Sequence, residues 1–199
     1  MSAHPVSMSE VKTMEPLKDK TILVTRPRDQ AAQLTQLLEQ LGAKVIVFPT
    51  IHIVPTSSWD DCDMAIANVD LYDAIIFTSV NAATYFLNHA KLVHTSIFDA
   101  FRKKDIYVVG EKTNRAVASF GLKGTTLKDV RDGRSLGQAL LHLTVLGKRF
   151  LFPRGNLSRA EVPSILRVHG AVVDEIVAYE TRPPSDMDTS TVKEMFSRK

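Results

Sequence analysis

The sequence contains a single cysteine, Cys62, and no long apolar run. One cysteine excludes an internal disulfide and a cysteine-based zinc cage, so we interpret Cys62 as a structural thiol. A helical span needs about 20 consecutive apolar residues, and no run approaches that length. The first 20 residues also lack the apolar core of a signal peptide. These absences predict a cytoplasmic protein with no membrane partner, preceded by a disordered leader over residues 1–19.

The chain also lacks a large net charge of either sign. The 25 Lys and Arg residues nearly balance the 22 Asp and Glu residues, which gives a net charge of +3. A nucleic-acid-binding protein would need a dense basic stripe, so no nucleic-acid partner is expected. The six histidines are scattered, and none follows a metal-binding spacing. The sequence therefore predicts no metal site. Its 44% hydrophobic content is typical of a globular protein.

Short apolar strands alternate with helical patterns along the chain. Leu34, Leu37, Leu38 and Leu41 follow the i, i+3, i+4, i+7 spacing of a helix with one apolar face. Another helix begins near Trp59. The expected strands cover 20–25, 43–49, 72–79, 105–110, 148–153 and 171–184, and the expected helices 29–42, 80–90, 111–121, 135–147 and 160–170. This alternation predicts an α/β fold with parallel sheets covered by helices.

An internal repeat relates the two ends of the chain. A shift of 128 residues gives nine identities over 36 positions, where chance gives about two at ordinary composition. The matched pairs are Lys20 and Lys148, Leu23 and Leu151, Arg26 and Arg154, Ala32 and Ala160, Leu38 and Leu166, Gly42 and Gly170, Ala43 and Ala171, Val45 and Val173, and Pro55 and Pro183. The pattern predicts two copies of a β-α-β unit.

Each copy ends in a long extended stretch, 45–55 or 172–184. Both are longer than a usual strand of about 5–6 residues, and between them lie enough residues for a complete domain. We therefore expect two doubly wound domains, the second inserted in the first, joined by a two-stranded antiparallel linker. The predicted boundaries are 20–50 and 180–199 for the first domain, 51–55 and 175–183 for the linker strands, and 56–174 for the second domain.

Four motifs in order carry a resemblance to a known family. They are "ILVTRP" followed by "LLEQLGAKVIVFPTIHI", then "YDAIIFTSVNA", "YVVGEKTNRAV" and "LFPRGNLSRAEVPSILRVHGAVVDEIVAYET", and they cover about residues 20–182. This pattern resembles the uroporphyrinogen-III synthases of haem biosynthesis. The resemblance implies two α/β domains with the substrate in the cleft between them, and a cofactor-free enzyme. A monomer is the ordinary expectation for a two-domain protein of this kind. Family members continue further, which implies that the first domain here lacks its C-terminal part.

The implied reaction is the cyclisation of hydroxymethylbilane, a linear tetrapyrrole, to uroporphyrinogen III. Water is lost and the last pyrrole ring is inverted. The substrate carries eight carboxylates and a good leaving group, so positioning is expected to dominate the catalysis. Two alternatives stay open. One is a non-catalytic or truncated protein of the same fold, and the other is a periplasmic-binding-like or flavodoxin-like binder, because fold analogy alone does not separate these.

The turns that follow two strands are candidate substrate-binding sites. Helix N-termini there can hold carboxylates through backbone N–H groups. Thr78, Ser79 and Asn81 lie at the end of the strand at 72–79. Capping of the following helix is the favoured role of Ser79, and it is compatible with ligand contact. Gly110 and Thr113 follow the strand at 105–110, where Gly110 would allow close backbone approach. An ordinary strand-to-helix turn is the alternative at both places.

The segment "FPRGNLSR" and its repeat partner supply further candidates. Arg26 and Arg154 both leave the end of a strand, where ligands of open α/β sheets collect. Either arginine could bind a substrate anion or form a surface salt bridge, and Gly155 joins them as a candidate. Tyr179 in "VAYET" is the resemblance's candidate for a catalytic proton donor or positioner, and packing of the linker is its alternative.

Overall fold

The computed structural model describes residues 15–94, 96–184 and 189–197. The chain divides into two compact units, one comprising Met1–His52 and Pro183–Lys199 and the other Ile53–Arg182. The chain therefore enters the second unit once and leaves it once, as the predicted insertion requires. Among the described residues, no helix is long and apolar enough to cross a membrane.

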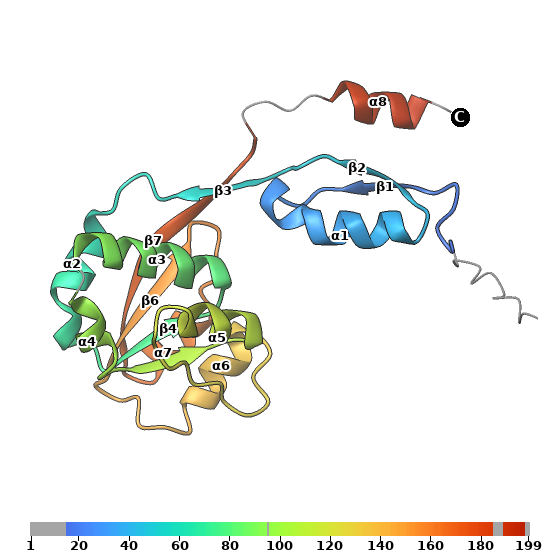
Figure 1. Ribbon diagram of the computed structural model, residues 1–199. Coiled ribbons are helices and arrows are strands. Elements are labelled where there is room, and N and C mark those ends of the chain that lie inside the picture. Colours follow the sequence, from blue (N-terminus) through green and yellow to red (C-terminus); the bar gives the residue numbers. More distant parts are fainter. Residues whose placement is uncertain (1–14, 95, 185–188, 198–199) are drawn as a thin grey trace, which may run out of the picture. The chain divides into compact units, whose positions relative to one another are not determined.

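Unit 1 contains a β-α-β element (Figure 1), made of β1 (Thr21–Val24), α1 (Arg28–Gln40) and β2 (Lys44–Val47). The two strands pair in parallel, with Thr21 opposite Lys44. Helix α1 ends where Gly42 adopts a φ of +90°, a conformation that glycine reaches without strain. A further helix, α8 (Ser190–Ser197), belongs to the same unit.

The end of the predicted leader is structured. Residues 1–14 lie outside the described residues, but 16–19 form a turn. The N–H of Leu17 donates to the carbonyl of Leu41 at 2.9 Å, and a Cβ on Gly42 would lie 2.9 Å from Glu15 Cβ. The prediction of disorder up to residue 19 is therefore wrong for 15–19, because these residues pack against the end of α1.

Unit 2 is built on a five-stranded sheet with the order β3-β7-β6-β4-β5. The parallel pairs are β4 with β5, β4 with β6, and β6 with β7. The strands are β3 (His52–Pro55), β4 (Ala74–Phe77), β5 (Asp105–Val108), β6 (Arg149–Gly155) and β7 (Val172–Arg182). The two predicted linker segments are neighbours as β3 and β7.

Helices cover both faces of this sheet. They are α2 (Asp60–Ala67), η1 (Val69–Leu71), α3 (Val80–Val93), α4 (Ile97–Phe101), α5 (Glu111–Ala118), α6 (Gly133–Leu140) and α7 (Glu161–Val168). Helices α2 to α5 contribute to a core that includes Ile75 and Phe77 of β4. Helices α6 and α7 contribute to a second core that includes Ile76 of the same strand and Phe152. Because successive residues of a strand face opposite sides, β4 is buried on both faces.

The internal repeat corresponds to equivalent backbone geometry. Gly42 and Gly170 both have positive φ, of +90° and +82°. The residue after each glycine donates to the carbonyl of Leu38 or Leu166, in both cases at 3.1 Å. The register Thr21 to Lys44 in unit 1 recurs as Arg149 to Val172 in unit 2. The predicted duplication of a β-α-β unit is confirmed by this agreement.

Two expectations about helices were wrong. The helix predicted over 135–147 ends at Leu140, because Leu143 turns back to donate to the Leu140 carbonyl at 2.9 Å and Gly147 takes a φ of +73°. Helix α4 was not expected, since five residues are too few to show a helical period.

Candidate functional site

A crevice opens where the chain connections of the sheet diverge. Strand β4 leads through α3 and α4 to β5, whereas its neighbour β6 leads through α7 to β7 on the other side. Helix α3 packs on one face of the sheet and α7 on the other. Ligands of open α/β sheets bind at such a switch point, outside the carboxyl ends of the strands.

A cavity of about 370 Å³ occupies this position. Its lining combines residues that follow β4, β5 and β6 with the first residues of α6 and α7. The lining residues are Thr78, Ser79, Val109, Arg131, Asp132, Gly133, Phe152, Ser158, Arg159, Glu161 and Val162. Two of the predicted substrate-binding residues, Thr78 and Ser79, are therefore at this cavity.

Helix α3 begins at the wall of the cavity. Ser79 Oγ accepts a hydrogen bond from the N–H of Ala82 at 3.1 Å, so Ser79 caps the helix as one interpretation predicted. Asn81 lies one residue into the helix and is partly buried. Whether these residues also bind a ligand stays a prediction.

Helix α6 begins with a capping box at the opposite wall. Asp132 accepts from the N–H of Ser135 at 2.8 Å and from its hydroxyl at 2.7 Å, and Ser135 Oγ accepts from the N–H of Asp132 at 3.0 Å. The hydrogen bonds from Ser135 hold the pKa of Asp132 below its ordinary value, with a smaller contribution from Arg134 and Arg159. Asp132 therefore lines the cavity as a charged carboxylate, and its Oδ1 accepts both hydrogen bonds from Ser135.

The arginines around the crevice differ in what they contact. Arg154 Nε lies 3.1 Å from Glu175 Oε2, and its NH1 donates to the carbonyls of Gly155 and Ser158, both at 3.3 Å. Its charge thus serves the protein's own turn, which favours the salt-bridge alternative for Arg154. Arg131 and Arg159 line the cavity, and their side chains form no hydrogen bond or ion pair within the described parts of the chain.

Gly155 and Tyr179 lie against each other. They are opposite residues of β6 and β7 at a register shift, and a Cβ on Gly155 would lie 2.5 Å from Tyr179 Cζ. The ring of Tyr179 also stacks on Tyr85 at 5.9 Å, and Tyr179 is only 9% exposed. This packing agrees with the structural alternative for Tyr179, and its catalytic role stays a prediction.

A hydrogen bond links that pair to the crevice. The N–H of Gly155 donates to Ser158 Oγ at 3.0 Å, and Ser158 lines the cavity. The ring of Tyr179 therefore supports the turn that forms one wall of the crevice, although Tyr179 itself is not a lining residue.

The remaining candidates are placed as follows. Gly110 is exposed, has a φ of +79° and directly follows the lining residue Val109. Thr113 is 4% exposed inside helix α5. Arg26 is exposed just after β1 in unit 1. Thr113 is not among the residues that line the crevice of unit 2.

Sequence reasoning missed most of the α6 and α7 side of the crevice. Those residues are Arg131, Asp132, Gly133, Ser158, Arg159, Glu161 and Val162. The Asp-x-x-Ser pattern at 132–135 is the one signal that could have marked a helix start there.

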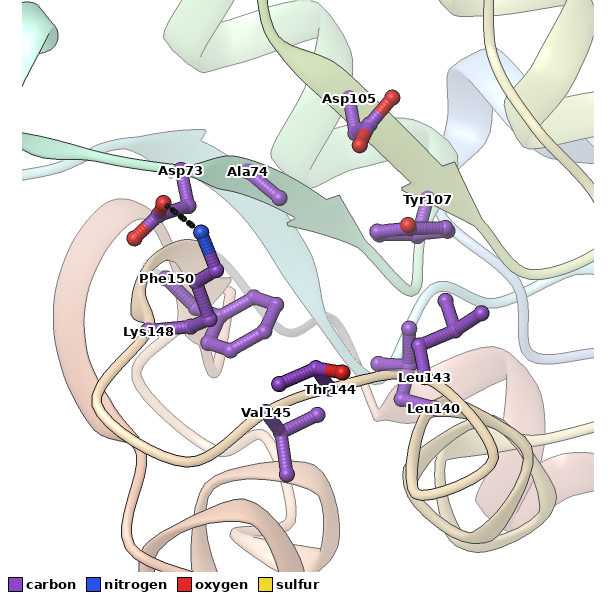
Figure 2. Close-up of a pocket in the computed structure, with 10 residues that line it drawn as sticks. All are labelled: Asp73, Ala74, Asp105, Tyr107, Leu140, Leu143, Thr144, Val145, Lys148 and Phe150. Atoms are coloured by element: carbon purple, nitrogen blue, oxygen red, sulfur yellow. Dashed lines mark hydrogen bonds and ion pairs between the residues drawn. The ribbon is translucent and has the colours of Figure 1, made fainter.

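Unit 2 has two further cavities, and in each of them oppositely charged lining residues pair with one another. A cavity of about 130 Å³ lies at the amino ends of β4 and β5 (Figure 2), where Lys148 Nζ donates to Asp73 at 2.7 Å. It contains no predicted site residue. A groove of about 560 Å³ beside α2 and β7 includes Arg149 and Arg167, which are ion-paired with Asp174 and Glu175, each at 2.7 Å. No group of three or more metal-ligating side chains occurs in residues 15–94, 96–184 and 189–197.

The chain that forms this crevice is similar to known proteins over most of its length. The profile of the uroporphyrinogen-III synthase HemD family matches residues 32–199. The chain belongs to the uroporphyrinogen-III synthase family. A uroporphyrinogen-III synthase from Chlorobaculum parvum is 33% identical over 178 residues, which are 89% of this chain and 70% of that protein. One from Synechococcus elongatus is 36% identical over 174 residues, or 87% of this chain and 65% of that protein.

The fold agrees with the family. A crystal structure of a mutant uroporphyrinogen III synthase from Thermus thermophilus superposes with a TM-score of 0.64 at 20% identity, over 83% of this chain and 64% of that one. This likeness confirms the α/β fold class. The chain spans about two thirds of the length of these synthases.

Proposed function

We propose that this chain acts in the reaction of its family, the cyclisation of hydroxymethylbilane to uroporphyrinogen III with loss of water and inversion of the last ring. The observation that carries the proposal is the family match over residues 32–199, together with synthases 33% and 36% identical. The reaction needs a site that binds carboxylates and fixes geometry, and the crevice of unit 2 offers such a surface.

The crevice is suited to one part of the substrate. Ligand pockets usually measure about 300–1,000 Å³, and a cavity of about 370 Å³ lies at the lower end of that range. It would therefore hold one pyrrole ring with its carboxylate arms. The hydroxyls of Thr78, Ser79 and Ser158 line it and can donate hydrogen bonds.

The chemistry proposed for this surface is mainly positioning. The substrate's leaving hydroxyl departs with the help of pyrrole electrons, so the protein has to orient the ring and prevent closure without inversion. Tyr179 supports the wall of the crevice through Gly155. We propose Tyr179 as the proton donor or positioner of the reaction.

The test supplies hydroxymethylbilane to the purified chain and resolves the type I and type III product isomers by chromatography. Type III product above the level of a protein-free reaction is the expected result. Type I product alone, from a folded sample, would contradict the enzyme proposal and favour a binding protein of the same fold. A sample unfolded by heat gives the matched background.

A further inference from the structure

The lining of the crevice includes two exposed arginines, Arg131 and Arg159. Arg131 precedes helix α6 and Arg159 precedes α7, so they reach the cavity from different segments. Both residues are exposed, and neither guanidinium forms a hydrogen bond or ion pair with another described residue. Arginine presents a planar fork of donors that matches a carboxylate in two-point contact.

The acidic residues of the same lining are already engaged. Asp132 accepts two hydrogen bonds from Ser135. Glu161 Oε1 lies 3.9 Å from Arg134 Nε, outside the lining. The lining therefore balances two acids with two arginines, and the hydrogen-bond donors that no described residue accepts from are the guanidinium groups of Arg131 and Arg159.

Backbone N–H groups add further donors for an anion. Helices α3, α6 and α7 all begin at the cavity, with Ser79, Gly133 and Glu161 at their first turns. The N-terminus of a helix carries partial positive charge that favours anions. The apolar floor at Phe152 and Val162 is buried and suits a flat ring.

We propose that Arg131 and Arg159 are specificity-determining residues that hold the carboxylate arms of the ligand's ring in this crevice. The inference rests on the proposed function for the identity of the ligand, and on the crevice for its carboxylate chemistry. Arg154, by contrast, shapes the wall through Glu175 and the 155–158 turn.

The probe is uroporphyrin I, an eight-carboxylate porphyrin whose fluorescence reports binding, compared with the four-carboxylate coproporphyrin I. Arg131→Gln and Arg159→Gln are each expected to weaken uroporphyrin binding about tenfold, the effect of one charge-assisted hydrogen bond at the lower end of its range. Arg159→Lys should lie between wild type and Arg159→Gln. The double variant should lose the preference for uroporphyrin over coproporphyrin.

The matched control is Arg102→Gln. Arg102 is an exposed arginine of unit 2 that pairs with Asp99 and does not line the cavity. The Arg102→Gln variant removes the same charge, so its affinity for uroporphyrin should change less than twofold. Equal losses in Arg102→Gln and the crevice variants would overturn the proposal, because binding would then follow net charge alone. Wild-type affinity in the double variant, or no uroporphyrin binding by the wild type, would also overturn it.

Kinetics separate this inference from the proposed function. Where type III product forms, the double variant should raise KM about 10-fold or more with a smaller change in kcat, since two binding contacts are removed. An unchanged KM would overturn the inference and leave the proposed function standing. Uroporphyrin binding that depends on the two arginines, without any type III product, would support the inference and contradict the proposed function.

Discussion

Asp73 is a single side chain that connects the starts of two strands. Its carboxylate accepts from Lys148 Nζ at 2.7 Å and from the N–H of Arg149 at 2.8 Å; Figure 2 shows the first of these contacts. The lysine, followed by the backbone N–H, holds the pKa of Asp73 below its ordinary value of 3.8. A carboxyl group with a depressed pKa stabilises the fold in its charged form.

We predict that Asp73→Asn lowers the free energy of unfolding at pH 7 by about 1 kcal/mol, a value reduced for the partial exposure of the pair. The folded pKa lies below the unfolded one, so this stabilisation is present above the unfolded pKa and is lost as pH falls through the folded pKa. The stability difference from wild type should therefore shrink below about pH 4. Urea unfolding between pH 2.5 and 7 measures it. Asp70→Asn is the control, because Asp70 is exposed and its carboxylate forms no hydrogen bond or ion pair with another described residue. A pH-independent difference would contradict the linkage.

The Tyr179→Phe variant tests whether turnover depends on the hydroxyl of Tyr179 or only on its ring. Tyr179→Phe keeps the contacts of the ring with Gly155 and Tyr85 and removes only the phenolic hydroxyl. We expect turnover to fall about 100-fold, the low end for a positioned proton donor, with an unchanged thermal midpoint. The isomer assay and differential scanning calorimetry check the two parts. Unchanged type III output would assign Tyr179 to packing alone.

The turn that ends β6 is the element that connects packing to the crevice. Gly155 lies at a register shift opposite Tyr179, and Ser158 closes the turn through its hydroxyl. Arg154 and Glu175 hold the same turn from the other side. The segment "FPRGNLSR" thus contains one structural arginine, Arg154, and one arginine at the cavity, Arg159.

We predict that Gly155→Ala lowers the stability of unit 2 by about 1–3 kcal/mol, the usual cost of overpacking a filled site. The new Cβ would lie 2.5 Å from Tyr179 Cζ and 2.7 Å from its hydroxyl oxygen. The turn should shift, so uroporphyrin affinity should fall with stability. Thermal unfolding and the porphyrin titration measure both. Leu157→Ala, at a side chain 73% exposed in the same turn, should change neither, and wild-type behaviour of Gly155→Ala would show that the site relaxes without cost.

The strands and helices were largely predictable because their signals are local. Leucine spacing located α1, and the repeat located β6, α7 and β7 from β1, α1 and β2. The crevice was predictable only on its β4 side. Arg131 and Asp132 belong to a stretch with no apolar period, and they come near Thr78 only through crossovers of a parallel sheet. Contacts of that kind depend on tertiary structure, which a local pattern does not contain.

At the scale of the whole molecule, the two units differ in the number of buried apolar side chains that they contain. Among the residues whose burial the structure describes, unit 1 has five buried apolar side chains, Val24, Pro27, Ala31, Ala43 and Pro49, whereas unit 2 has many more. An isolated two-stranded element is marginally stable, whereas unit 2 has a five-stranded sheet with a core on each face. The units should therefore open with different free energies.

We predict that backbone amides of β1 and β2 exchange through openings of about 0–3 kcal/mol, while those of β4 and β6 need the global free energy of about 5–15 kcal/mol. Native-state hydrogen exchange on the full chain measures both. Val24→Ala should speed exchange in β1 and β2 alone, and Ile76→Ala should lower protection in unit 2 by about 2–5 kcal/mol. Val24 and Ile76 are both buried, at 4% and 0% exposure, which makes the pair a matched comparison. Equal protection of β1 and β4, or a Val24→Ala effect that spreads to β4, would show that the two units unfold as one cooperative body.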